Sequence, residues 1–283
     1  VPEEETQQSS IMKKAQYYYH RQHYIDLSYS LFYFFSNPTS KYDPEGIAFS
    51  SLIQVLNRIL LVFPPFFERN QFGEQLNGQQ FPSYLETLLL HINNYSDMLR
   101  DDDAKIIEVE EGQNEVLHIN PEEVKCNDRK TRKVLLELLF FLSNCIKYKP
   151  LAQQILNDHL LTRYHFIENM ELFDFSQKQL ALLTLLTVFY YFPIEFVQEI
   201  PNHEAILDEA ADISYSTTSS YYLITFVMTM LFLFDNYFEL LRDIDYESLM
   251  EALQFISELD NPEVSETAQI LFEKINSQFE SEQ

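Results

Sequence analysis

Glycine, cysteine, tryptophan and basic residues are all scarce in this chain of 283 residues. Four glycines argue against most nucleotide-binding loops, because those loops need glycine to bring the backbone close to phosphate. Two cysteines are too few for a disulfide framework or a zinc site built from cysteine alone. Tryptophan is absent, but 24 phenylalanines and 18 tyrosines supply other aromatic side chains for a core.

Positive charge is in short supply as well. Lys and Arg total 19 against 44 Asp and Glu, and the formal net charge is −25. Phosphate contacts need clustered Lys and Arg, so this balance argues against direct binding of nucleic acid or of an anionic membrane. Hydrophobic residues make up 46 % of the chain, which is enough for a globular core. We expect a protein partner with a basic surface or segment.

The longest apolar runs, 180–192 and 221–234, are shorter than the roughly 20 residues that a membrane-spanning helix needs. We expect two buried helices and no membrane span. The chain opens on an acidic, polar stretch where a secretory signal would be basic and then apolar. With so few cysteines, this favours a reducing compartment, cytoplasmic or nuclear.

Apolar residues recur at helical spacing in several segments, for example at Leu52, Leu56 and Phe63. No segment shows the sustained alternation and tight turns of a β-hairpin. The predicted fold class is therefore all-α, with about 10–13 helices. Residues 1–10 are expected to form a flexible polar tail, and residues 11–280 a single helical-repeat domain.

Several local signals predict where helices begin and end. A cap residue, a proline and an acid predict helix starts at Asp43, Asn120 and Asn261, and Ser176 to Gln179 fits a capping box. Prolines predict helix ends, because proline cannot continue a helix. These prolines are Pro64, Pro65, Pro150, Pro193 and Pro201. The acidic segment at about 101–120 is interpreted as a solvated insertion loop, with an acidic docking arm as the alternative.

A weak internal repeat runs through the chain. An apolar helix, a break and a second, shorter helix begin at Glu137, Thr184 and Thr229, with a similar plan from Gln54 and a last copy from Ala252. The offsets among the first three copies lie close to 45 residues, and helical repeats of about 40–47 residues are the signature of armadillo and HEAT arrays.

On this layout, residues 129–275 resemble a degenerate armadillo or HEAT array, a right-handed α-solenoid of stacked helix pairs. The resemblance implies a long concave surface that binds extended peptides or other proteins. Peptide-binding armadillo repeats carry a ladder of asparagines. Asn144 and Asn236 stand in the expected region, but Tyr191 takes the place between them. An irregular all-α bundle is the alternative fold.

Acidic residues dominate the C-terminal part, where residues 151–283 hold 23 acids and four basic residues. A surface that steers a basic partner toward the protein is one interpretation, and simple solubility is the other. The candidate partner-binding residues are Glu195, Glu199, Glu204, Asp208, Glu209, Asp212, Asn236, Glu239, Asp243 and Asp245.

Basic residues gather in the middle of the chain, with seven of the 19 between 125 and 149. A salt-bridged helix start facing the acidic segment is one interpretation, and a second docking patch for an acidic partner is the other. This patch consists of Lys125, Arg129, Lys130, Arg132 and Lys133.

Motifs for chemistry are weak. His20 and His23 have the spacing of two metal ligands, but a stable site needs three or four. We therefore expect no catalytic residue, no metal and no cofactor. The sequence predicts a non-enzymatic interaction scaffold or regulatory subunit. The alternatives are a chaperone or carrier for a basic client, such as a histone, ribosomal or nucleic-acid-binding protein, and an all-α metal-dependent enzyme.

Overall fold

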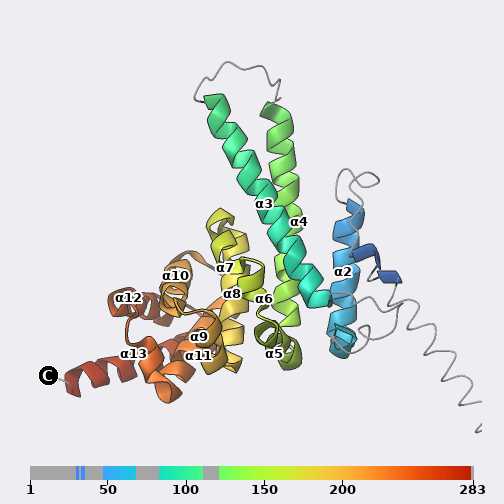
Figure 1. Ribbon diagram of the computed structural model, residues 1–283. Helices are drawn as coiled ribbons and strands as arrows, with labels where there is room; N and C mark the ends of the chain where they lie inside the picture. The colour runs from blue at the N-terminus through green and yellow to red at the C-terminus, as the bar shows by residue number, and fades with distance from the viewer. Residues whose placement is uncertain (1–29, 32, 36–46, 68–82, 111–120, 282–283) are drawn as a thin grey trace, which may run out of the picture. The chain divides into compact units, whose positions relative to one another are not determined.

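The computed structural model describes residues 30–31, 33–35, 47–67, 83–110 and 121–281 (Figure 1). Every regular element in these ranges is a helix, and none of them contains a strand. Twelve α-helices lie in the described residues, within the predicted range. The all-α class is therefore confirmed.

The chain divides by its contacts into two compact units, Val1–Thr87 and Leu88–Gln283. The division falls in the first turn of a long helix, whereas the sequence predicts one domain over 11–280. The polar tail predicted for residues 1–10 lies outside the described residues.

Helix bounds in the first part of the chain are α2 (Ile47–Val62), the 3-10 helix η1 (Pro64–Phe67) and α3 (Tyr84–Glu110). The later elements are α4 (Pro121–Cys145), α5 (Lys149–Asn157), α6 (Leu160–Arg163), α7 (Phe166–Asn169), η3 (Met170–Leu172), α8 (Phe175–Tyr191), α9 (Pro193–Glu199), α10 (His203–Ser216), α11 (Ser220–Asn236), η4 (Phe238–Leu241), α12 (Tyr246–Ser257) and α13 (Pro262–Ser281). Figure 1 colours them from blue at α2 to red at α13.

Aromatic rings build the core of the first unit. The ring of Tyr84 lies 5.0 Å from that of Phe67 and 5.5 Å from that of Phe66, centroid to centroid. Phe35 stacks on Phe49 at 5.9 Å. Such ring pairs add stabilisation beyond the area that they bury. This unit therefore uses the abundant phenylalanine and tyrosine of the chain for core packing.

Helix α8 is the centre of the second unit. Its residues from Ala181 to Phe189 are all buried, because α4 and α11 both pack against it. Helix α11 in turn packs against α13, and α10 packs against α12. The run 180–192 is thus a buried helix, as predicted. Within the described residues, no helix combines the length and the apolar character that crossing a membrane requires.

Most of the predicted helix boundaries are confirmed. Helices α4 and α13 begin at Pro121 and Pro262, directly after their asparagines. Helix α2 ends before Pro64 and α8 before Pro193. The start predicted at Asp43 lies outside the described residues.

The predicted capping box is wrong by two residues. The carboxylate of Asp174 accepts a 3.0 Å hydrogen bond from the backbone N–H of Gln177, whose side chain accepts one from the Asp174 N–H. Asp174 and Gln177 have the same spacing as Ser176 and Gln179. In the pair that caps α8, the Gln177 side chain is buried and also donates to the Arg132 carbonyl oxygen at 2.9 Å.

The acidic segment at 101–120 is not a loop throughout, because α3 continues through its first half to Glu110. This half contains alanine, lysine and glutamate, which are strong helix formers. The second half, 111–120, lies outside the described residues.

Candidate functional site

Five carboxylates meet where α10 packs against α12, and we call them the acidic cluster. Its members are Glu204, Asp208, Asp212, Asp245 and Glu251. The first three follow one another at spacings of four on α10, so they share one face of that helix. Asp245 is the N-cap of α12, and its backbone N–H donates a 2.9 Å hydrogen bond to Asp208. The Ser248 hydroxyl donates to Asp212 at 3.3 Å.

The electrostatics of the acidic cluster are unfavourable in the free protein. Partial burial raises the pKa of Asp208, and the negative charges of Asp245, Asp212 and Glu204 raise it further. In the described residues, no Lys or Arg lies within ion-pair distance of these carboxylates. The imidazole of His203 lies with its Nε2 3.5 Å from a Glu204 carboxylate oxygen, and it offsets that charge only when it is protonated.

Tyr215 marks the other end of the cluster. Its hydroxyl donates to the Ser248 carbonyl at 3.2 Å and to the Glu251 carboxylate at 3.3 Å. Burial, with the neighbouring charge of Glu251, raises the pKa of Tyr215 to about 12. Neither Tyr215 nor Glu251 was a sequence candidate. Tyr215 lies on α10 and Glu251 on α12, and the packing of these two helices brings them together. Predicting either residue would have required knowing that α10 packs against α12.

Glu199 does not belong to this surface, contrary to the sequence prediction. Its side chain is 2 % exposed and lies at the start of α6. One carboxylate oxygen accepts from the backbone N–H and the hydroxyl of Thr162 at 3.3 and 3.4 Å. The other oxygen is buried without a hydrogen bond, 3.8 Å from Nδ1 of His159. Burial raises the pKa of Glu199, against the opposing effect of these contacts.

The remaining acidic candidates are scattered. Glu209 pairs with Lys178, so its charge is already matched. Glu195, Glu239 and Asp243 are exposed on α9, η4 and the turn after η4, outside the acidic cluster. Asn236 donates to the Phe232 carbonyl at 2.9 Å, within its own helix.

The predicted basic patch lies on α4. Arg132 pairs with Asp128 at 2.8 Å and donates to the Leu172 carbonyl at 3.2 Å, so it braces the fold. Arg129 and Lys133 are exposed, and Lys130 is half-buried. Nothing is described of the Lys125 side chain.

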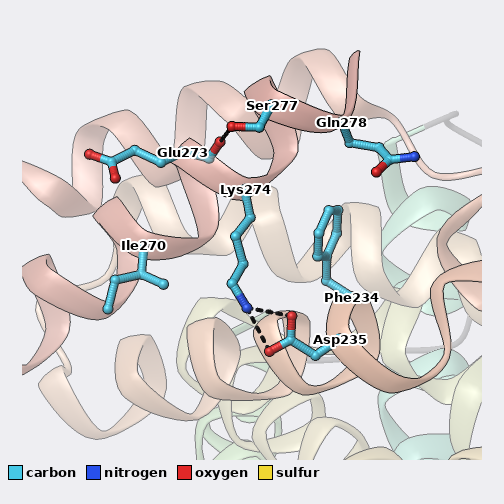
Figure 2. A pocket seen from close by; sticks show the side chains of 7 residues that line it. All are labelled: Phe234, Asp235, Ile270, Glu273, Lys274, Ser277 and Gln278. Atoms are coloured by element: carbon cyan, nitrogen blue, oxygen red, sulfur yellow. Dashed lines mark hydrogen bonds and ion pairs between the residues drawn. The ribbon is translucent and has the colours of Figure 1, made fainter. Parts of the chain in front are cut away.

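A hollow of about 560 Å³ lies between the end of α11 and α13 (Figure 2). Lys274 reaches from α13 to Asp235 on α11, and its Nζ lies 2.7 Å from one carboxylate oxygen. The ammonium group is therefore occupied by an internal ion pair. The remaining lining residues are Phe234, Ile270, Glu273, Ser277 and Gln278. These side chains do not converge on one point. We interpret the hollow as a place where an ion pair holds α11 and α13 together, and not as a binding site.

Groups for metal or nucleophilic chemistry are few. No set of three His, Cys, Asp or Glu side chains in the described ranges could hold a metal ion. His20 and His23 lie outside those ranges. Cys145 is buried in α4, and burial raises the pKa of its thiol, which keeps it protonated and unreactive.

The chain matches no protein-family model, no curated protein and no solved structure among those compared. The functional interpretation of the acidic cluster therefore rests on its geometry alone.

Proposed function

We propose that this protein is a non-enzymatic interaction module, a scaffold or regulatory subunit, that binds a basic segment of a partner protein on its acidic cluster. The observation that carries the proposal is the crowding of Glu204, Asp212 and Asp245 around Asp208, in an acidic cluster that no Lys or Arg of the described residues balances. A cationic partner would relieve that repulsion and would be steered toward the site by its field.

A helical-repeat stack for the second unit is part of the proposal, and its hydrogen bonds support it. Bonds that join separate helices recur at similar sequence separations. Gln177 reaches back 45 residues to Arg132, Tyr191 reaches back 44 to Lys147, and Asp245 reaches back 37 to Asp208. Each helix pair in such a stack contacts its neighbours, so bonds at roughly one repeat length are expected.

The packing pairs support the same arrangement. Helices α4, α8, α11 and α13 contact one another in that order, and α10 contacts α12 beside them. Shorter helices follow two of the repeat starts, α5 after α4 and α9 after α8. Helix α13 departs from the repeat, because it is 20 residues long where a shorter helix is expected.

A capture experiment tests the function. The tagged full chain is used as bait in native extract at low salt and at about 0.15 M salt, with mass spectrometry of the captured proteins. The test bait carries Glu204→Gln, Asp208→Asn, Asp212→Asn and Glu251→Gln. Asp245 is kept, because its carboxylate accepts the backbone N–H groups of Glu247 and Ser248 and so caps α12.

The matched control loses the same amount of charge elsewhere. It carries Glu195→Gln, Glu239→Gln, Glu258→Gln and Glu266→Gln, all at exposed positions. We expect the unmodified and control baits to capture one partner at the higher salt, and the test bait to lose it. Equal capture by the test bait would contradict the proposal. A broad set of basic proteins, lost at the higher salt, would favour the carrier alternative instead.

A further inference from the structure

An open groove of about 250 Å³ separates α8 from α11, and it is distinct from the acidic cluster. The residues lining it are Thr187, Tyr190, Tyr191, Tyr221, Ile224, Thr225, Met228 and Thr229. Tyr221 and Met228 are 45 % and 41 % exposed, which is high for large apolar side chains. The groove therefore leaves apolar surface open to solvent between two helices of the core.

The threonine hydroxyls of the groove are already hydrogen-bonded within their own helices. The hydroxyl of Thr187 donates to the Leu183 carbonyl at 2.7 Å, and that of Thr225 donates to the Tyr221 carbonyl at 2.8 Å. The Thr229 hydroxyl donates to the Thr225 carbonyl at 2.8 Å. An apolar group that enters beside these threonines therefore leaves none of their hydroxyls unpaired.

Aromatic contacts hold one wall of the groove in place. The ring of Tyr190 lies 4.9 Å from that of Phe232 and 5.8 Å from that of Tyr191. Rings fixed by such contacts lose little freedom when a ligand binds, and buried aromatic side chains are common anchors in interfaces.

Two lysines stand at the end of this aromatic wall. Nζ of Lys147 lies 4.5 Å from the ring centroid of Tyr221, and burial lowers the pKa of this lysine. Nζ of Lys149 lies 5.2 Å from the ring centroid of Phe192 and 5.9 Å from that of Tyr191. No carboxylate of the described residues pairs with either lysine, although the chain has 44 acidic residues.

We infer that this groove binds a peptide segment of a partner in which an aromatic or large aliphatic side chain stands next to Asp or Glu. The apolar side chain enters the groove between α8 and α11, and the carboxylate meets Lys147 or Lys149. An engineered protein cavity of about 150 Å³ admits benzene, so the groove has room for one such side chain. Its charge preference is opposite to that of the acidic cluster, so the two sites would take different segments.

Panning of a phage-displayed library of random peptides on the full chain tests the inference. Phage that also bind the Lys147→Glu/Lys149→Glu variant are removed before sequencing. We expect the remaining peptides to place an acidic residue beside an aromatic or large aliphatic one. Recovery of no peptide, or of peptides without that pairing, would overturn the inference.

The affinity of the most enriched peptide gives the second test, by fluorescence anisotropy. We expect the Lys147→Glu/Lys149→Glu variant and the Tyr221→Ala variant each to bind it about tenfold or more weakly. The control is Arg242→Glu, a charge reversal at an exposed position outside the groove. Circular dichroism identifies variants that remain folded. Equal affinity of the folded groove variants would overturn the inference.

The two sites can be separated in the same assay. Asp208→Asn/Asp212→Asn removes charge from the acidic cluster and leaves the groove unchanged, so it should not weaken binding of the peptide. If these substitutions weaken it as much as the lysine reversals do, the peptide is not bound by the groove and the inference fails. Loss of a basic partner on the same substitutions, with the peptide still bound, would support both sites.

Discussion

The carboxylate of Asp208 accepts a 2.9 Å hydrogen bond from the backbone N–H of Asp245, so α10 holds the start of α12 with a residue that is itself surrounded by negative charge. Asp208 thus stabilises the fold through this hydrogen bond and destabilises it through repulsion from the neighbouring carboxylates. The free energies of these two effects can be separated by substitution.

Asp208→Asn should increase the free energy of unfolding at neutral pH by a few tenths of a kcal/mol. Asparagine keeps the oxygen that accepts the Asp245 N–H, but it removes a negative charge four residues from both Glu204 and Asp212. Urea unfolding at low salt measures the effect. It should shrink as salt is added, because salt screens exposed charges.

The pH dependence of this effect has a definite sign. The folded-state pKa of Asp208 is raised, so protonation stabilises the folded state, and this contribution is lost as pH rises through the folded pKa. The advantage of Asp208→Asn should therefore be greatest at neutral pH and should disappear below the pKa of an unfolded aspartate, about 3.9. Glu195→Gln, on an exposed glutamate of α9 outside the acidic cluster, is the control.

Substitutions of Glu199 should separate its hydrogen bonds from its charge. Glu199→Ala removes the acceptor for the Thr162 N–H and should cost about 1 kcal/mol, like the loss of an N-cap. Glu199→Gln keeps an acceptor and removes a buried charge whose pKa is raised, so it should be at least as stable as the natural protein at neutral pH. Its advantage should fade as pH decreases. A glutamine variant as unstable as the alanine variant would show that the charge itself is needed.

Gln177→Ala should be among the costlier polar substitutions in the second unit. It removes the side-chain acceptor for the Asp174 N–H and the 2.9 Å bond to the Arg132 carbonyl from a fully buried position. The expected loss is about 1–3 kcal/mol in the free energy of unfolding, measured with urea. Gln153→Ala, at an exposed position on α5, is the control and should change stability very little.

Glycine should be preferred to alanine at residue 165. His165 has φ of 49°, in the left-handed region where a side chain is unfavourable and glycine is not. We expect His165→Gly to be more stable than His165→Ala by about 1 kcal/mol in thermal unfolding. At Gln254, an exposed position inside α12, the order should reverse, because glycine is the poorer residue within a helix. The same order at both positions would contradict the assigned backbone conformation.

Local signals made several elements predictable from the sequence. Proline after asparagine predicted the starts of α4 and α13, and the run 180–192 predicted a buried helix that is now seen as α8. These features depend on neighbouring residues alone. The capping box was predicted at the wrong pair because Asp174 and Gln177 have the same spacing as Ser176 and Gln179, and the bond from Gln177 to Arg132 across the fold is not visible in the sequence.

The candidate site was predictable in part. Spacings of four among Glu204, Asp208 and Asp212 indicate one helical face, and all three were predicted. Their meeting with Asp245 depends on the packing of α10 against α12, which no local pattern encodes. Glu199 looked like a surface acid, but its side chain is buried against the start of α6. That helix follows His159, a non-glycine residue with φ of 51° that gives no turn signal in the sequence.

The most direct test of the proposed function is amide hydrogen–deuterium exchange of the full chain, alone and with the partner captured by the unmodified bait. The account predicts slower exchange over 203–216 and 245–251, where α10 and α12 carry the acidic cluster, and no such protection in the variant neutralised at Glu204, Asp208, Asp212 and Glu251. A captured partner that leaves exchange in both segments unchanged would contradict it.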